Sequence, residues 1–212
     1  MATILYDYWR SSAAYRVRMA LNLKSVAYDS VPVNLLEGEH RGAAHLARNP
    51  QGLVPALEID GRMMTQSLAI IEYLDETRPE PPLLPADPEG RQRVRALAHA
   101  IAMDIHPVCN MSVSRYAASL IGGEDGAAQW MRRFIRPGLE AVEALLDSPA
   151  TGGFCHGDAV SIADLCLVPQ IYNARRWQVP VEDLRRVGAV MAALEALPEI
   201  AAAHPDRVRP AA

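Results

Sequence analysis

Two adjacent hydroxyl side chains, Ser11 and Ser12, stand where a strand pattern gives way to a helix pattern. The start of a helix carries a partial positive charge and free N–H groups, so it stabilises a bound anion or thiolate. Serine is also a preferred N-cap, which explains the residue type without any ligand. Both interpretations use one geometry, because one serine can cap the helix while the other donates a hydrogen bond to a ligand sulfur.

Two further positions could meet a ligand. Pro55 lies in the apolar run LVPAL, and proline is unfavourable in a central strand. It indicates either an edge strand or a cis-proline that leaves the backbone of Val54 free to pair with an extended ligand. Gln66 and Ser67 precede a regular helix pattern, so Ser67 is the expected N-cap, and an anion site at this helix start is the alternative.

Ser161 and Asp164 have a structural interpretation. They match the S-x-x-D variant of the capping box at the start of a later helix. Cys166 in the same helix is expected in the core. The sequence has no CxxC pair, HExxH motif, Walker loop or GxGxxG motif, so no metal site is predicted.

The elements that position these residues are read from hydrophobic periodicity. The expected strands are 3–8, 27–34, 53–61 and 62–67, and the expected helices are 12–24, 35–48 and 67–77. A helical crossover predicts that the first two strands are parallel, and Asp60-Gly61 predicts a tight turn between the last two. In the first helix Ala14, Val17 and Leu21 share one face, while Arg16 and Arg18 lie elsewhere. The order is β-α-β-α-β-β-α.

A proline-rich segment, 78–90, separates this pattern from an all-helical one. The predicted organisation is a first domain at 1–80, a linker at 81–90 and a helical domain at 91–212. A long first helix in that domain is expected to carry the apolar stripe from Val94 to Val108. Pro137 is expected to kink or break the next helix, and helices at 161–173 and 182–197 follow.

Composition excludes several classes of protein. The chain has 212 residues, of which 50% are hydrophobic and 22% charged, and a net charge of -4, so it lacks the basic character of a nucleic-acid-binding protein. No apolar stretch approaches the roughly 20 residues that span a bilayer, and the N-terminal residues do not resemble a signal peptide. Three scattered cysteines argue against a disulfide framework and indicate a reducing, cytoplasmic setting.

Together these motifs resemble the zeta class of the glutathione transferases over essentially the whole chain. The resemblance is carried by YWRSSAAYRVRMAL, NPQGLVPAL, QSLAIIEYLDETRP, LLPADPEGRQRVRAL and GDAVSIADLCLVPQIYNARRW. It implies a thioredoxin-like domain that binds glutathione, followed by a helical bundle. It also implies a homodimer, built mainly between the first domain of one protomer and the helices of the other.

Matching positions imply the roles of individual residues. Ser11 is the activating hydroxyl, with Ser12 beside it. The positions that match glutathione contacts of the family are His40, Val54, Gln66, Ser67, His106 and Asn110. Val54 would pair through its backbone beside a cis-Pro55, Gln66 and Ser67 would hold the γ-glutamyl end, and His40 would lie near the glycine carboxylate. The family pattern is Ser-Ser-Cys, and this chain departs from it with Ala13, so the effect of the missing thiol is left open.

The class includes maleylacetoacetate isomerase and the bacterial maleylpyruvate isomerases, which implies cis–trans isomerisation of a maleyl diketo acid. The hypothesis is that a glutathione thiolate adds to the cis double bond, the bond rotates, and elimination releases the trans, fumaryl product and the thiolate. The substrate is a dicarboxylate, so positive groups should meet it. Arg10 and Arg176 are the candidates, and Arg175 is expected to be solvated.

The stretch MSVSRY after Asn110 resembles the maleylacetoacetate branch, which favours a role in tyrosine and phenylalanine breakdown over maleylpyruvate as the substrate. Two other functions remain as alternatives to isomerisation. One is a general glutathione transferase or dehalogenase that acts on α-halo acids. The other is a non-catalytic binding module on the same fold, which the presence of both serines disfavours.

Overall fold

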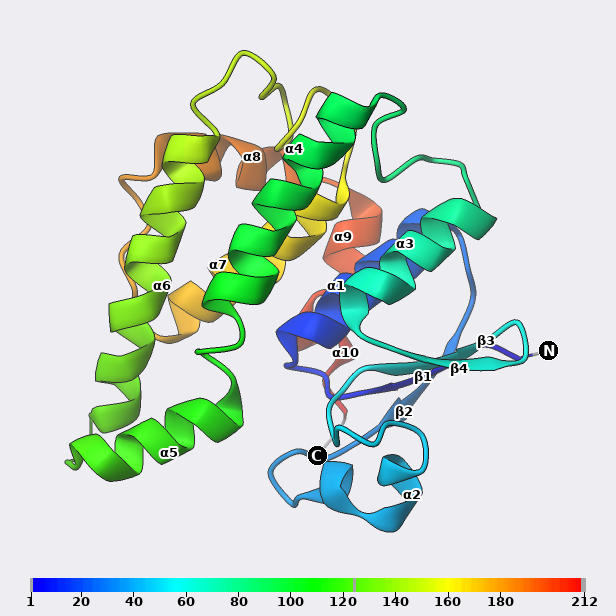
Figure 1. Cartoon of the computed structure of the whole chain (residues 1–212), viewed down its shortest axis with the longest axis vertical. Helices are drawn as coiled ribbons and strands as arrows, with labels where there is room; N and C mark the ends of the chain where they lie inside the picture. The colour runs from blue at the N-terminus through cyan, green and yellow to red at the C-terminus, as the bar shows by residue number, and fades with distance from the viewer. Residues whose placement is uncertain (1, 124, 211–212) are drawn as a thin grey trace. The chain divides into compact units, whose positions relative to one another are not determined.

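The structure is a computed structural model that describes residues 2–123 and 125–210. These residues form two compact units (Figure 1). The first contains the described residues up to Pro82 together with those from Ala196 onward, and the second runs from Leu83 to Glu195. No helix in the described part of the chain is long and apolar enough to cross a membrane.

The first unit is built on a mixed four-stranded sheet in the order β2-β1-β3-β4. Its strands are β1 (Ile4–Asp7), β2 (Asp29–Pro32), β3 (Ala56–Ile59) and β4 (Arg62–Thr65). β1 pairs with β2 in parallel, as predicted, and β3 is antiparallel to both β1 and β4. Asp60 and Gly61 connect β3 to β4 with φ of 53° and 73°, the left-handed conformation that a tight hairpin turn requires.

Two helices, α1 (Ser12–Leu23) and α3 (Ser67–Thr77), pack against each other on one face of this sheet (Figure 1). Short helices complete the unit: η1 (Glu39–Arg41), α2 (Ala43–Leu46), α9 (Pro198–Ala202) and α10 (Pro205–Val208). The core consists of apolar side chains that are fully buried, including Leu5, Ala14, Val17, Leu21, Leu57, Ile70, Ile71 and Leu74. Burial of these groups is the main stabilising term.

Arg16 and Arg18 are buried, contrary to the expectation that they lie away from the apolar face of the first helix. Their exposed fractions are 2% and 1%. The Arg18 guanidinium forms an ion pair with Asp7 at 2.6 Å and donates hydrogen bonds to the carbonyls of Trp9 and Ala203. A buried charge is tolerated only when it is paired in this way, and these partners lie in two other segments of the chain, at residues 7–9 and at Ala203.

The second unit is helical. Its helices are α4 (Pro88–His99), the wider η2 (Ala100–Ile105), α5 (Met111–Ile121), α6 (Gly126–Leu145), α7 (Ile162–Arg176) and α8 (Arg185–Glu195). α7 is buried on nearly all sides and packs against α4, η2, α6 and α8. The predicted capping box is present, because Ser161 and Asp164 bond to each other's backbone N–H groups, and Cys166 is fully buried as expected.

One expectation about helix length is wrong, and a second is wrong in part. The long first helix of this unit ends at Ile105, two residues before Pro107, which lacks the N–H needed to extend it. The second concerns α6, which is not broken at Pro137 but continues through it. Buried residues on both sides of Pro137, among them Met131 and Val142, hold the two halves in one helix, so tertiary packing outweighs the single lost hydrogen bond.

Candidate active site

The register of the sheet brings three distant segments to the same end of the first unit. Ala56 pairs with Tyr6 of β1 and with Thr65 of β4. β1 therefore ends, β3 begins and β4 ends at one end of the sheet. The segments attached there are the three that were predicted to bind a ligand: Ser11–Ser12 after β1, Val54–Pro55 before β3 and Gln66–Ser67 after β4.

Ser11 is the N-cap of α1. Its Oγ accepts a hydrogen bond from the Ala14 N–H at 3.3 Å, and accepting that bond leaves its own hydroxyl proton available to a ligand. Ser12 and Ala13 are the first two helical residues, whose N–H groups have no acceptor inside an α-helix. The first turn contains no acidic side chain. This helix N-terminus is therefore suited to an anion.

Arg10 adds a positive charge directly before Ser11. It is half-buried, and its guanidinium carbon lies 5.3 Å from the centre of the Trp9 ring and 6.0 Å from that of Tyr8. Contact with the faces of aromatic rings stabilises a cation without neutralising its charge. The charge of Arg10 therefore persists beside the N-terminus of α1.

The Val54–Pro55 peptide bond is cis, which confirms one of the two interpretations of Pro55. The edge-strand interpretation is wrong, because β3 lies between β1 and β4. Val54 lies outside the ladder, which begins at Ala56. Two buried side chains hold the preceding Leu53 carbonyl: His45 through Nε2 at 2.9 Å and Asn49 through Nδ2 at 2.8 Å.

Sequence reasoning missed His45 and Asn49. Asn49 opens the quoted run NPQGLVPAL, which is a weak signal, and nothing in the sequence distinguishes His45. Both side chains fix the backbone directly before Val54, because the Leu53 carbonyl accepts from both of them.

Gln66, not Ser67, is the N-cap of α3, and it supplies no capping side chain. Its φ of 67° is uncommon for a residue other than glycine, and such conformations concentrate at functional sites. The exposed Gln66 side chain donates from Nε2 to Gln51 Oε1 at 2.8 Å. Ser67 is the first helical residue and is 7% exposed, and its Oγ accepts a hydrogen bond from Nη1 of Arg16 at 3.3 Å.

His40 is half-buried in η1, on the segment after β2. Its role beside a glycine carboxylate stays a prediction.

The other predicted residues belong to the second unit. His106 directly follows η2, and Asn110 is the N-cap of α5, where its Oδ1 accepts from the Ser112 N–H at 3.2 Å. Arg176 ends α7 and is exposed, and its Nη1 donates to Asn173 Oδ1 at 3.4 Å. Arg175 is paired at the surface with Glu195 at 2.7 Å.

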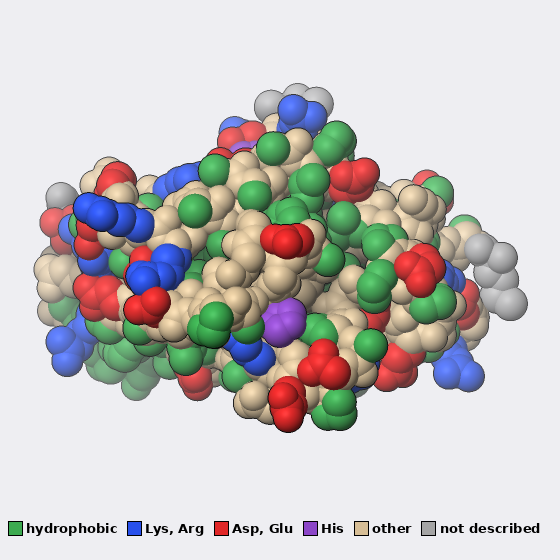
Figure 2. All heavy atoms as spheres, turned by 90° about the horizontal axis from the view of Figure 1, so that it is seen from above, with side chains coloured by type: hydrophobic (Ala, Val, Ile, Leu, Met, Phe, Trp, Pro, Cys, Tyr) green, Lys and Arg blue, Asp and Glu red, His purple; other side chains and the backbone are tan. Residues whose placement is uncertain are grey.

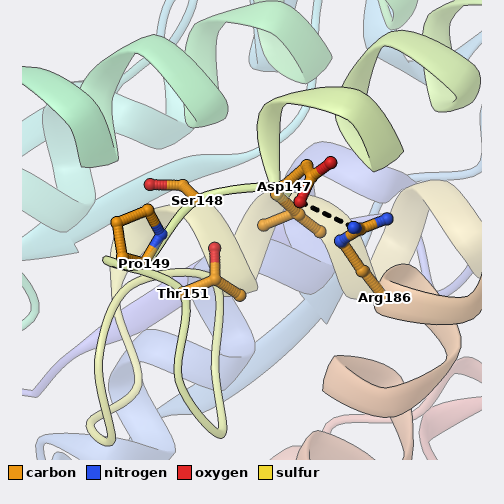
Figure 3. A pocket seen from close by; sticks show the side chains of 6 residues that line it. Asp147, Ser148, Pro149, Thr151 and Arg186 are labelled. Carbon is orange, nitrogen blue, oxygen red and sulfur yellow. Dashed lines mark ion pairs between the residues drawn. The ribbon is translucent and has the colours of Figure 1, made fainter.

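A pocket of about 380 Å³ in the second unit does not include any predicted site residue (Figure 3). Asp147, Ser148, Pro149, Thr151, Leu146 and Arg186 line it. Arg186 is already paired with Asp147 at 2.6 Å and with Glu143 at 3.4 Å, so its charge is largely neutralised. This pocket is therefore poorly suited to bind a dicarboxylate.

The cysteines of the chain do not supply a thiolate. Burial raises the pKa of Cys109 to about 11, and burial together with the nearby Asp164 carboxylate raises the pKa of Cys155 well above its ordinary value. Cys166 is fully buried. Among residues 2–123 and 125–210, no group of three His, Cys, Asp or Glu side chains could hold a metal ion. A thiolate at the α1 N-terminus would therefore come from a ligand.

Known proteins share this arrangement. Residues 5–82 match the N-terminal domain of glutathione S-transferases. The chain is 59% identical over 209 residues to the maleylacetoacetate isomerase of Rhizobium meliloti strain 1021, covering 98% of each. It is also 43% identical, with a TM-score of 0.95, to a holo structure of maleyl pyruvate isomerase, a bacterial zeta-class glutathione S-transferase, covering 99% of this chain and 100% of that one. This chain belongs to the zeta class of the glutathione S-transferases.

The predicted fold class is thereby confirmed: a thioredoxin-like domain with a mixed four-stranded sheet, followed by a helical domain. A second solved structure, the maleylacetoacetate isomerase of Methylobacterium extorquens AM1, has been crystallised with bound malonate and glutathione. Its chain is 40% identical with a TM-score of 0.94, and the match covers 98% of this chain and 100% of that one.

Proposed function

We propose that this chain is a glutathione-dependent maleylacetoacetate isomerase. The observation that carries the proposal is the N-terminus of α1, where a serine hydroxyl and unpaired N–H groups can stabilise a sulfur anion that the chain itself cannot provide. When bound, glutathione supplies a thiolate that adds to the maleyl double bond and later leaves it, so the tripeptide is not consumed.

The residues of the first unit fit that cofactor. Ser11 would donate a hydrogen bond from its hydroxyl to the sulfur and keep its proton, and the first N–H groups of α1 would lower the pKa of the bound thiol further. The backbone of Val54, which lies outside the β1–β3 ladder, would bond to the extended peptide, and the hydrogen bonds to the Leu53 carbonyl would hold it in place. Gln66 and Ser67 bind the γ-glutamyl end at the start of α3.

Arg10 and Arg176 are proposed to recognise the carboxylates of the substrate. The bound malonate of the Methylobacterium relative supports a dicarboxylate ligand. Arginine suits this task because its planar fork of donors matches a carboxylate and its charge does not titrate. Here the Arg10 guanidinium lies against the Trp9 ring, and Arg176 is exposed at the end of α7.

Two wider assignments are also proposed: a homodimer and a cytoplasmic location. Three free cysteines, all buried, support a reducing compartment. On the face drawn in Figure 2, acidic and basic side chains are interspersed, and that face has no extended basic surface for a polyanion. Light scattering of the purified protein on a sizing column tests the dimer.

The function is tested by mixing the protein, glutathione and maleylacetone, following the dienol absorbance and titrating free thiol. Isomerisation with an unchanged amount of thiol is expected. Loss of one thiol per substrate would instead identify a conjugating transferase, and an inert mixture would identify a binding module. Ser11→Ala protein is the matched control, because it keeps the fold and removes one hydroxyl.

A further inference from the structure

Arg16 has an unusual environment for an arginine. It lies in the middle of α1, is 2% exposed, and directs Nη1 at the Ser67 hydroxyl, 3.3 Å away at the start of α3. Arginine is almost never fully buried without a specific reason, because desolvating a guanidinium is costly. Packing alone does not supply the reason, since α1 and α3 already meet through fully buried apolar side chains.

The hydrogen bond fixes the role of the Ser67 hydroxyl. A guanidinium only donates, so the Ser67 oxygen is the acceptor in this bond. The remaining proton of the hydroxyl is then free to be donated to another group. Without Arg16, the same hydroxyl could rotate and accept a hydrogen bond as easily as donate one. Because Arg16 occupies one lone pair of Ser67, it orients the hydroxyl so that its proton points away from the guanidinium.

The start of α3 offers donor groups to a ligand. The first turn of α3 has free N–H groups and contains no acidic side chain. The buried charge of Arg16 lies behind Ser67, where the effective dielectric constant is lower than in water and its field is stronger. Donors and positive potential together match a carboxylate and oppose an ammonium group.

We propose that Arg16 is a positioning residue for glutathione, which holds the Ser67 hydroxyl as an outward donor and favours the α-carboxylate of the γ-glutamyl residue. This inference rests on the proposed function, because Ser67 is assigned there to the γ-glutamyl end. Arg16 acts through Ser67 and through its charge, and it has no part in the sulfur chemistry proposed at Ser11.

The test compares two peptides by calorimetry. One is glutathione, and the other is 4-aminobutanoyl-cysteinylglycine, which is glutathione without the α-carboxylate. Arg16→Met should raise the Kd of glutathione by about 10- to 100-fold, the range for a hydrogen bond to a charged group, and change the Kd of the second peptide less than about threefold. Arg16→Lys keeps the charge and should recover part of the loss. Bound-thiol pKa and kcat at saturating glutathione should be unchanged.

Arg18→Met is the matched control, because Arg18 is the other buried arginine of α1 but bonds to Asp7, Trp9 and Ala203. It should lower Tm and affect both peptides alike. In a double-mutant cycle, adding Ser67→Ala to Arg16→Met should cost little more affinity.

An equal loss of both peptides in Arg16→Met, or additive effects in the cycle, would overturn the inference. If Arg16→Met does not fold, Arg16→Lys decides by the same selectivity between the peptides. Wild-type protein that binds no glutathione overturns the proposed function as well, whereas an active wild type with unselective Arg16 variants overturns this inference alone.

Discussion

Replacing Ser11 with alanine separates the two tasks of one hydroxyl. The substitution removes the N-cap acceptor of the Ala14 N–H and, in the proposed mechanism, the donor to the thiolate. Loss of an N-cap costs about 0.5 to 2 kcal/mol, and the 3.3 Å bond points to the lower end of that range. For a chain of this size, Tm should fall by about 2 °C.

The catalytic loss should be larger. A hydrogen bond to a charged group contributes about 1.5 to 3 kcal/mol, and each pKa unit corresponds to about 1.36 kcal/mol, so the pKa of the bound thiol should rise by about one to two units. If the bound thiol of the wild type has a pKa of about 7, the thiolate fraction at neutral pH would fall about 5- to 50-fold. Because the pKa is raised, activity should shift to higher pH, and the loss should shrink as pH rises through the new pKa.

The assay is the pH profile of kcat for maleylacetone, together with ultraviolet titration of the bound thiol. Ser11→Gly is the control, because glycine at an N-cap costs only a few tenths of a kcal/mol but also lacks the hydroxyl. Both variants should lose the same activity and differ in Tm. An activity loss that follows Tm, or an unshifted pH profile, would refute the role of Ser11, and a shift seen only in Ser12→Ala would transfer that role to Ser12.

Three further results are expected. Replacing Arg10 or Arg176 with alanine should raise KM for a dicarboxylate far more than for a neutral haloarene, and equal effects on both substrates would count against a role in carboxylate recognition. Arg18→Met should lower the free energy of unfolding in urea by about 3 to 5 kcal/mol, because it leaves the Asp7 carboxylate buried and unpaired, and a cost below about 1 kcal/mol would show that this pair behaves as a surface pair. Cys109, with its pKa raised to about 11 by burial, should react with iodoacetamide at neutral pH far more slowly in native than in unfolded protein, and Cys109→Ala should retain isomerase activity; rapid native alkylation would contradict the burial argument.

Much of the first unit follows from local sequence. The helix at Ser67–Thr77 was predicted at those bounds, and Asp60-Gly61 forms the turn expected of it, because periodicity and turn chemistry act over a few residues. The capping box of Ser161 and Asp164 is local for the same reason. The cap of α3 was misassigned, since the positive φ of Gln66 is imposed by the surrounding backbone.

The sequence by itself determined the order of strands and helices from β1 to α3, the two serines at the start of α1 and the family to which the chain is similar. Only the tertiary structure decided that Arg16 and Arg18 are buried, that α6 passes through Pro137, and that His45 and Asn49 clamp Leu53. The physical reason is how far apart in the sequence the interacting residues are. Caps, turns and periodicity depend on neighbours along the chain, whereas a buried charge depends on partners such as Ser67 and Asp7 that approach it only when the sheet and its helices have assembled.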